Sequence, residues 1–119
     1  TGEVVREQPR LLQDAVCALM EAQRLMYQKR SLVIDVAVKY TGFSREVVAR
    51  TYDELSARGI WPVNEALRKE LVEAGIETEV LVGNIRPGER PVYEQAVEWG
   101  FARACVTKLG RWTGDARWY

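Results

Sequence analysis

Hydrophobic residues recur every three or four positions along most of this chain, the spacing that places side chains on one face of an α-helix. Segment 8–29 shows the pattern most clearly. Pro9 stands in its first turn, where the missing amide costs nothing. The expected core-facing stripe consists of Leu12, Ala15, Val16, Leu19, Gln23 and Met26. The pattern therefore predicts a long helix that packs against the rest of the chain.

Segment 44–58 carries its own start and stop signals. Gly42 interrupts the preceding pattern, and Ser44 is a good N-cap because its hydroxyl can accept a hydrogen bond from a free amide of the first turn. Gly59 can adopt the left-handed conformation that ends a helix, and Pro62 prevents an immediate restart. These signals predict a helix over 44–58.

Segment 31–40 is open to two interpretations, because its β-branched residues suit a strand and a short apolar run has no decisive period. Ser31 can cap a helix, and three apolar residues share one helical face: Ile34, Ala37 and Val38. We therefore expect a helix over 31–40.

Segment 64–82 follows the helical period with Asn64 as its expected N-cap, but it contains Gly75. An internal glycine costs about 1 kcal/mol relative to alanine, so the helix could instead break near that residue. We favour one continuous helix that ends at Gly83.

The whole pattern predicts an all-α fold in a single helical domain or fragment over 1–119. After a loop at 83–91, a last helix is expected over 93–109, and Gly110 ends it. The tail at 110–119 is expected to pack its tryptophans back onto the fold. The about five helices expected are 8–29, 31–40, 44–58, 64–82 and 93–109.

Composition narrows the possible functions. The 119 residues include 17 basic and 17 acidic side chains and no histidine. The charge balance makes a nucleic-acid partner unlikely, and no apolar run is long enough for membrane insertion. Without histidine, ordinary zinc sites and His-based acid–base or nucleophilic catalysis are excluded. We expect no enzyme activity, no catalytic residue, no metal site and no cofactor.

The two cysteines, Cys17 and Cys105, lie among apolar residues on expected helices and far apart in the sequence. Neither belongs to a Cys-x-x-Cys pattern. We therefore expect two small buried hydrophobic side chains rather than a disulfide or a nucleophile.

Five short motifs resemble the C-terminal part of periplasmic substrate-binding proteins of the nitrate, sulfonate and taurine type of ABC importer. They are Thr-Gly-Phe-Ser at 41–44, Tyr-Asp-Glu-Leu at 52–55, Gly-Ile-Trp-Pro-Val-Asn at 59–64, Gly-x-Ile-x-Pro-Gly-x-x-Pro at 83–91 and Lys-Leu-Gly at 108–110. No single motif is specific, but their order and spacing cover most of the chain, from about 9 to 109.

This resemblance implies an exported parent protein with two α/β lobes, which passes a small solute to an ABC permease from the periplasm or another extracytoplasmic space. The chain, which begins without Met and shows no signal peptide, would be a trimmed, processed or truncated product. Most ligand contacts of the family come from earlier in the parent, so the ligand-binding residues of this chain are unknown.

The same stretch more loosely resembles a helix-turn-helix of a bacterial transcription regulator, centred on 33–60. Its expected recognition helix would present Arg45, Glu46, Ala49, Arg50 and Glu54. Acidic residues on a groove-facing surface repel phosphates, and no hairpin signal follows Ile60, so this interpretation is the alternative.

Helices that normally cover a sheet would leave apolar faces exposed in an isolated fragment. We therefore expect the isolated chain to self-associate as a dimer or a higher oligomer.

Overall fold

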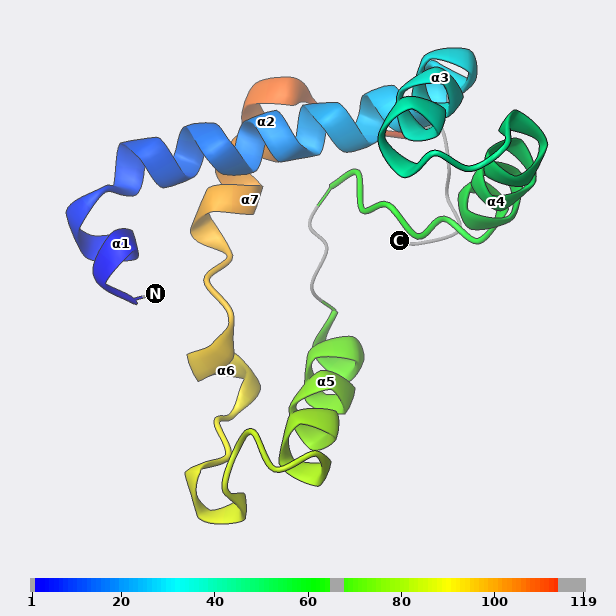
Figure 1. Ribbon diagram of the computed structural model, residues 1–119. Helices are drawn as coiled ribbons and strands as arrows, with labels where there is room; N and C mark the ends of the chain where they lie inside the picture. The colour runs from blue at the N-terminus through cyan, green and yellow to red at the C-terminus, as the bar shows by residue number, and fades with distance from the viewer. Residues whose placement is uncertain (1, 65–67, 114–119) are drawn as a thin grey trace.

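The computed structural model describes residues 2–64 and 68–113 and confirms the all-α class, with no strand among those residues (Figure 1). Its helices, in chain order, are α1 (Gly2–Glu7), α2 (Pro9–Gln28), α3 (Arg30–Thr41), α4 (Arg45–Ala57), α5 (Lys69–Leu81), the short 3-10 helix η1 (Pro87–Glu89), α6 (Tyr93–Ala96) and α7 (Gly100–Leu109).

The expected signals around α4 are confirmed. The Oγ of Ser44 accepts a hydrogen bond from the amide of Val47 at 3.3 Å, so the side chain caps the helix. Gly42 and Gly59 have φ angles of 73° and 63°, in the left-handed region that favours glycine. The turn before α4 and the stop after it are therefore set by local chemistry.

Segment 31–40 is helical, but the expected cap is wrong. Helix α3 begins at Arg30, with Lys29 in the cap position and no side-chain cap bond, so Ser31 lies inside the first turn. The amide of Val33 bonds to the carbonyl oxygen of Lys29 at 3.0 Å, which starts the helix one residue earlier than predicted.

Helix α5 passes through Gly75 without a break, as expected, and Gly83 follows its end with a φ of 82°. The expected start is wrong, because α5 begins at Lys69. Asn64 does not act as an N-cap; its side-chain oxygen accepts hydrogen bonds from Arg24 and from the amide of Trp112 instead. Residues 65–67, which belong to the expected helix over 64–82, lie outside the described part of the chain.

The single helix expected over 93–109 is wrong, because the structure has two short helices there. Between α6 and α7, Val97 is extended, with φ −126° and ψ 126°. The carboxylate of Glu98 accepts a hydrogen bond from the amide of Gly100 at 2.7 Å. This local bond gives the backbone an alternative to the helical ladder, and α7 starts anew at Gly100.

Two small clusters form the core of the described residues. One joins α2 to α7 around Cys17, Met20 and Cys105, and the other joins α3 to α4 around Ile34, Val48 and Tyr52. The stripe expected on α2 is only partly correct: Val16 packs against the first cluster, whereas Ala15 and Leu19 are exposed.

The helices do not close into a compact body (Figure 1). Helices α5 and α6 form an arm that stands apart from α2, α3 and α4. The radius of gyration is 16.9 Å, whereas a compact chain of this length has about 13–14 Å. The accessible surface is 8696 Å², against about 6,600 Å² for a folded monomer of the same mass. The chain therefore exposes about 2,000 Å² more than a closed domain would.

Candidate functional site

The strongest link between distant parts of the chain is a disulfide between Cys17 and Cys105, where α7 crosses α2. Both cysteines are buried, as expected, but the prediction that they are not bonded to each other is wrong. Their Cα atoms lie 5.2 Å apart although 88 positions separate them. No local spacing could have indicated this pair, because the crossing of the two helices creates it.

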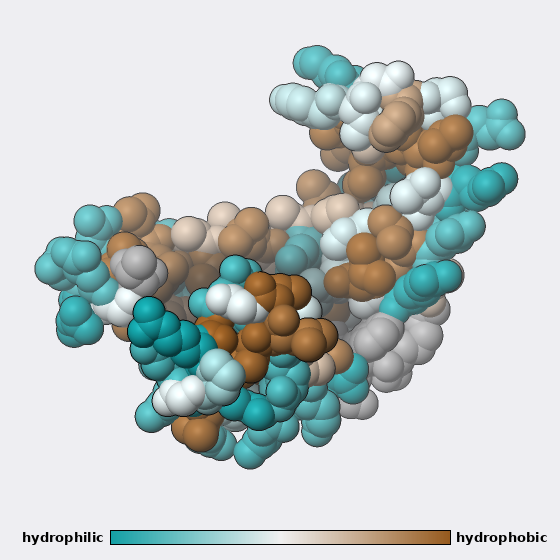
Figure 2. Space-filling model, turned by 60° about the horizontal axis from the view of Figure 1, so that its bottom comes forward, coloured by the Kyte–Doolittle hydropathy of each residue, from teal (hydrophilic) through white to brown (hydrophobic). Residues whose placement is uncertain are grey.

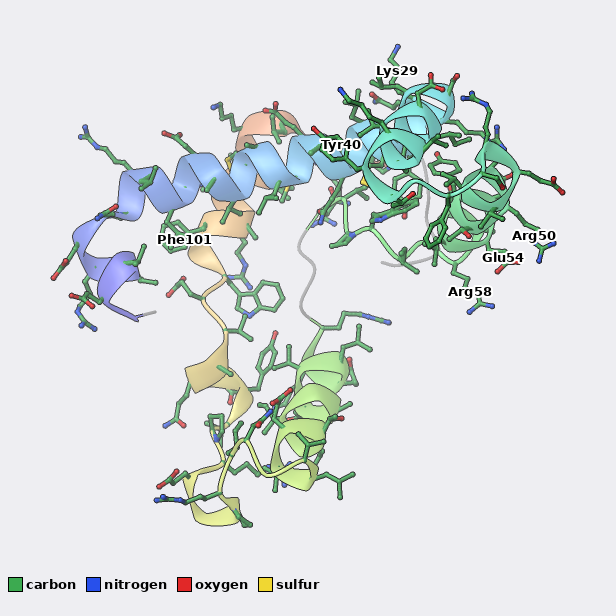
Figure 3. All side chains as sticks on the ribbon, viewed as in Figure 1. Lys29, Tyr40, Arg50, Glu54, Arg58 and Phe101 are labelled. Carbon is green, nitrogen blue, oxygen red and sulfur yellow. A yellow bond between two sulfur atoms is a disulfide. The ribbon has the colours of Figure 1, made fainter. Side chains whose placement is uncertain are left out.

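The side chain of Gln13 extends the same junction. Its Nε2 donates to the carbonyl oxygen of Phe101 at 2.9 Å and lies 2.9 Å from the Sγ of Cys105. Figure 3 places Phe101 beneath α2, on the side from which α7 approaches. One amide group therefore helps to position the first turn of α7 on α2.

A second junction is built around the guanidinium of Arg24. Nε donates to the carbonyl oxygen of Val63 at 2.9 Å, and Nη2 donates to that of Gly110 at 2.7 Å and to Oδ1 of Asn64 at 3.1 Å. A positive charge beside the last carbonyls of α7 is also favourable for the helix dipole. All of these partners are neutral oxygens, so this arginine has the contacts of a structural residue.

Asn64 completes this second junction and is only 3% exposed. Its Oδ1 accepts a hydrogen bond from the amide of Trp112 at 2.8 Å, and its Nδ2 donates to the carbonyl oxygen of Trp112 at 3.1 Å. Trp112 is thereby held on the fold, as expected for the tail; Trp118 lies outside the described residues. The two junctions hold the start and the end of α7 on α2 through polar contacts, in addition to the disulfide.

Helices α3 and α4 are joined by two ion pairs between exposed side chains. Arg30 binds Asp53 in a two-point contact, and Arg45 binds Asp35. The hydrogen bonds from Arg30 lower the pKa of the Asp53 carboxyl, and the same contact raises the pKa of Arg30. The first pair joins the start of α3 to the third turn of α4, and the second joins the middle of α3 to the start of α4.

An aromatic cluster anchors this helix pair to α2. The ring of Trp61 lies 5.4 Å from that of Tyr27 and 5.5 Å from that of Tyr52, measured between ring centroids. The hydroxyl of Tyr52 donates to the carbonyl oxygen of Met26 at 2.6 Å. The Gly-Ile-Trp-Pro segment thus uses its tryptophan to fix the exit from α4 against the end of α2.

An apolar groove of about 320 Å³ opens between α3 and α4. Its wall is almost entirely hydrophobic and consists of Met26, Val33, Ala37, Thr41, Phe43, Val47, Val48, Thr51, Tyr52, Leu55 and Trp61. Phe43, in the turn between the helices, is 63% exposed at its edge. Figure 2 shows further hydrophobic patches left uncovered on the face that it presents. A groove of this composition suits an apolar side chain of a partner better than a polar solute.

A second hollow, of about 380 Å³, lies beside α2 and the start of α7. Its wall includes Leu12, Leu19 and Trp99, with Gln23, Asn64 and Glu98 as polar members. Among the described residues, Glu98 is the one charged side chain in this lining.

The five residues of the expected recognition helix lie in different surroundings. Arg45 is paired with Asp35, and Ala49 packs against the α3–α4 core. Glu46, Arg50 and Glu54 are exposed, and Figure 3 shows Arg50 and Glu54 pointing away from α4. The surface that α4 offers to a groove therefore mixes both signs of charge.

Within 2–64 and 68–113, no group of three or more His, Cys, Asp or Glu side chains could hold a metal ion. No helix in the same residues is long and apolar enough to cross a membrane.

A comparison of the chain with protein-family models, curated proteins and solved structures finds no match.

Proposed function

We propose that this chain is the C-terminal helical portion of an ABC-importer solute-binding protein of the nitrate, sulfonate and taurine type. In this role it is a structural cover for a lobe of the parent protein and contains no complete ligand site. The parent, and not this segment alone, binds the small solute and passes it to the permease. The five ordered motifs support this proposal, since two of them form the α4 start and the aromatic exit seen in the fold.

The observation that carries the proposal is the buried disulfide between Cys17 and Cys105. Disulfides persist in oxidising compartments such as the bacterial periplasm and are rare in the reducing cytosol. An exported binding protein works in the first environment, whereas a transcription regulator works in the second. The disulfide therefore favours an extracytoplasmic location and the transport function.

The uncovered surface is a second support. About 2,000 Å² more surface is exposed than in a closed domain of this mass, and the exposed set includes Leu11, Leu19, Phe43, Leu71 and Leu81. Amphipathic helices need another layer against which to bury their apolar faces. In the proposed parent, that layer is a lobe with a β-sheet.

The experiment that tests the proposal is detection of the native protein in its source cells with an antibody raised against this chain. Cells are separated into an osmotic-shock fraction and a cytoplasmic fraction before gel analysis. We expect a band two to three times larger than the chain, corresponding to about 250–300 residues in two lobes, in the shock fraction. A band of 13.6 kDa in the cytoplasm would refute the transport function.

Solute binding is then measured on the purified parent. Nitrate, sulfate, taurine and an alkanesulfonate are each added, and the melting temperature is followed. A ligand at about 100 times its Kd stabilises the folded state by about 2.7 kcal/mol. We expect such stabilisation by one of these solutes and none for the isolated 119-residue chain.

A helix-turn-helix remains the second candidate because of one observation. Helices α3 and α4 are joined by a three-residue turn with a left-handed glycine at 42 and a capped start at Ser44, as in that motif. Gel-shift assays on duplex DNA at low salt test it, with Arg50→Ala as the variant and Arg86→Ala, outside these helices, as the control. The DNA-binding function requires binding that falls steeply with salt and weakens only in Arg50→Ala.

A further inference from the structure

The turn between α3 and α4 carries an exposed aromatic side chain directly beside an apolar groove. Phe43 is 63% exposed and forms one edge of the groove, whose floor contains Met26, Val48 and Trp61. A projecting ring and an open hydrophobic hollow therefore occupy the same surface.

We propose that this surface is a two-fold interface between two copies of the chain, in which Phe43 of each copy inserts into the α3–α4 groove of the other. A two-fold interface needs one patch that is complementary to itself, and a ring placed next to a groove meets that condition. Aromatic residues that fill hydrophobic pockets are also the side chains that contribute most to binding energy at interfaces.

The charges around the turn are compatible with this pairing. Two of the nearby arginines, Arg30 and Arg45, are already neutralised by carboxylates on the facing helix. The exposed charges next to the turn are Lys39 on α3 and Glu46 on α4, one of each sign. A two-fold axis near Phe43 can bring Lys39 of one copy towards Glu46 of the other, so the rim of the interface is not repulsive.

The chain as a whole exposes more surface than a closed monomer of its mass. A stable interface buries about 800 Å² on each partner, and each chain exposes about 2,000 Å² beyond the surface of a closed monomer. The inference concerns the isolated chain and does not depend on the transport function.

The experiment is sedimentation equilibrium of the 119-residue chain from about 1 to 100 µM, a range that spans moderate dimer affinities. The wild type is compared with Phe43→Glu and with the matched control Leu81→Glu. Leu81 is 86% exposed on α5, outside the groove, so both variants exchange an exposed apolar residue for the same charge. Circular dichroism establishes that the helical content of both variants equals that of the wild type.

We expect the wild type and Leu81→Glu to approach twice the 13.6 kDa chain mass. Phe43→Glu should weaken the dimer about 30-fold or more, the effect of losing a strong interface residue. A monomeric wild type at the highest concentration would overturn the proposal. Equal losses in the two variants, or a mass that grows beyond the dimer without regard to Phe43, would also overturn it, because association would then be non-specific or use another face.

Discussion

The guanidinium of Arg30 donates two hydrogen bonds of 2.7 Å to the carboxylate of Asp53, from Nε to Oδ1 and from Nη2 to Oδ2. They join the start of α3 to the third turn of α4. The pair is exposed to solvent, where isolated ion pairs contribute little to stability. Its geometry is nevertheless the two-point arrangement in which arginine recognises carboxylates best.

The first prediction concerns the pH dependence of this contact. Because the pKa of Asp53 is lowered in the folded state, the pair stabilises the fold above the ordinary Asp pKa of 3.8. The contribution is lost as pH falls through the lower folded-state pKa. In Arg30→Met, the pKa of Asp53 should return towards its ordinary value, which a carboxyl-carbon NMR titration measures. An unchanged titration curve would show that Arg30 does not hold Asp53 in solution.

The second prediction concerns the disulfide. Cross-linking positions 88 residues apart removes chain entropy from the unfolded state, and replacing both Cys17 and Cys105 by alanine should lower the free energy of unfolding by about 4–5 kcal/mol. Urea denaturation of the wild type, with and without a reductant, gives the comparison. The reductant should have no effect on the double variant. Alkylation of both thiols in the unreduced wild type would contradict the bond.

The third prediction concerns Asn64, which is buried and bonds to Arg24 and to the backbone of Trp112. Asn64→Leu leaves buried polar groups without partners, so the free energy of unfolding should fall by about 2–4 kcal/mol. The control is Asn84→Leu, since the side chain of Asn84 is exposed and donates to the nearby Glu79 carboxylate. A control change as large as that of Asn64→Leu would mean that burial of the amide does not matter.

The fourth prediction separates a true helix cap from an expected one. Ser44→Ala removes the bond to the amide of Val47 and should cost about 0.5–2 kcal/mol. Ser31→Ala, inside the first turn of α3, should be neutral or slightly stabilising, because alanine has the higher helix propensity. Thermal denaturation of the two variants measures the difference, and equal losses would show that Ser44 is not a cap.

Much of the helical framework could be predicted because its signals are local. Pro9, Gly42, Ser44 and Gly59 each act within one turn of their own position, and the starts and stops that they indicate are found in α2, α3 and α4. Gly75 was correctly expected not to interrupt α5, since its cost is small compared with that of ending a helix.

The features that connect distant segments could not be predicted in this way. The pairing of Cys17 with Cys105 depends on how α7 crosses α2, and the bonds of Asn64 to Trp112 depend on the path of the chain just after α7. The hydrophobic spacing in α2 likewise indicates that this helix is amphipathic. It does not indicate which of its apolar residues contact α7. The break at 97–99 coincides with an extended Val97 and a side-chain bond from Gly100 to Glu98, local features that the helical period does not indicate.

The covalent link between α2 and α7 also changes what a cut in the chain would do. Because Cys17 and Cys105 close a ring that contains α3, α4, α5 and α6, a protease that cleaves one peptide bond inside this ring separates no part of the protein. The nicked molecule keeps its mass on a non-reducing gel and yields two fragments only after reduction. In an environment rich in proteases, the chain can therefore survive its first cleavage as a single molecule.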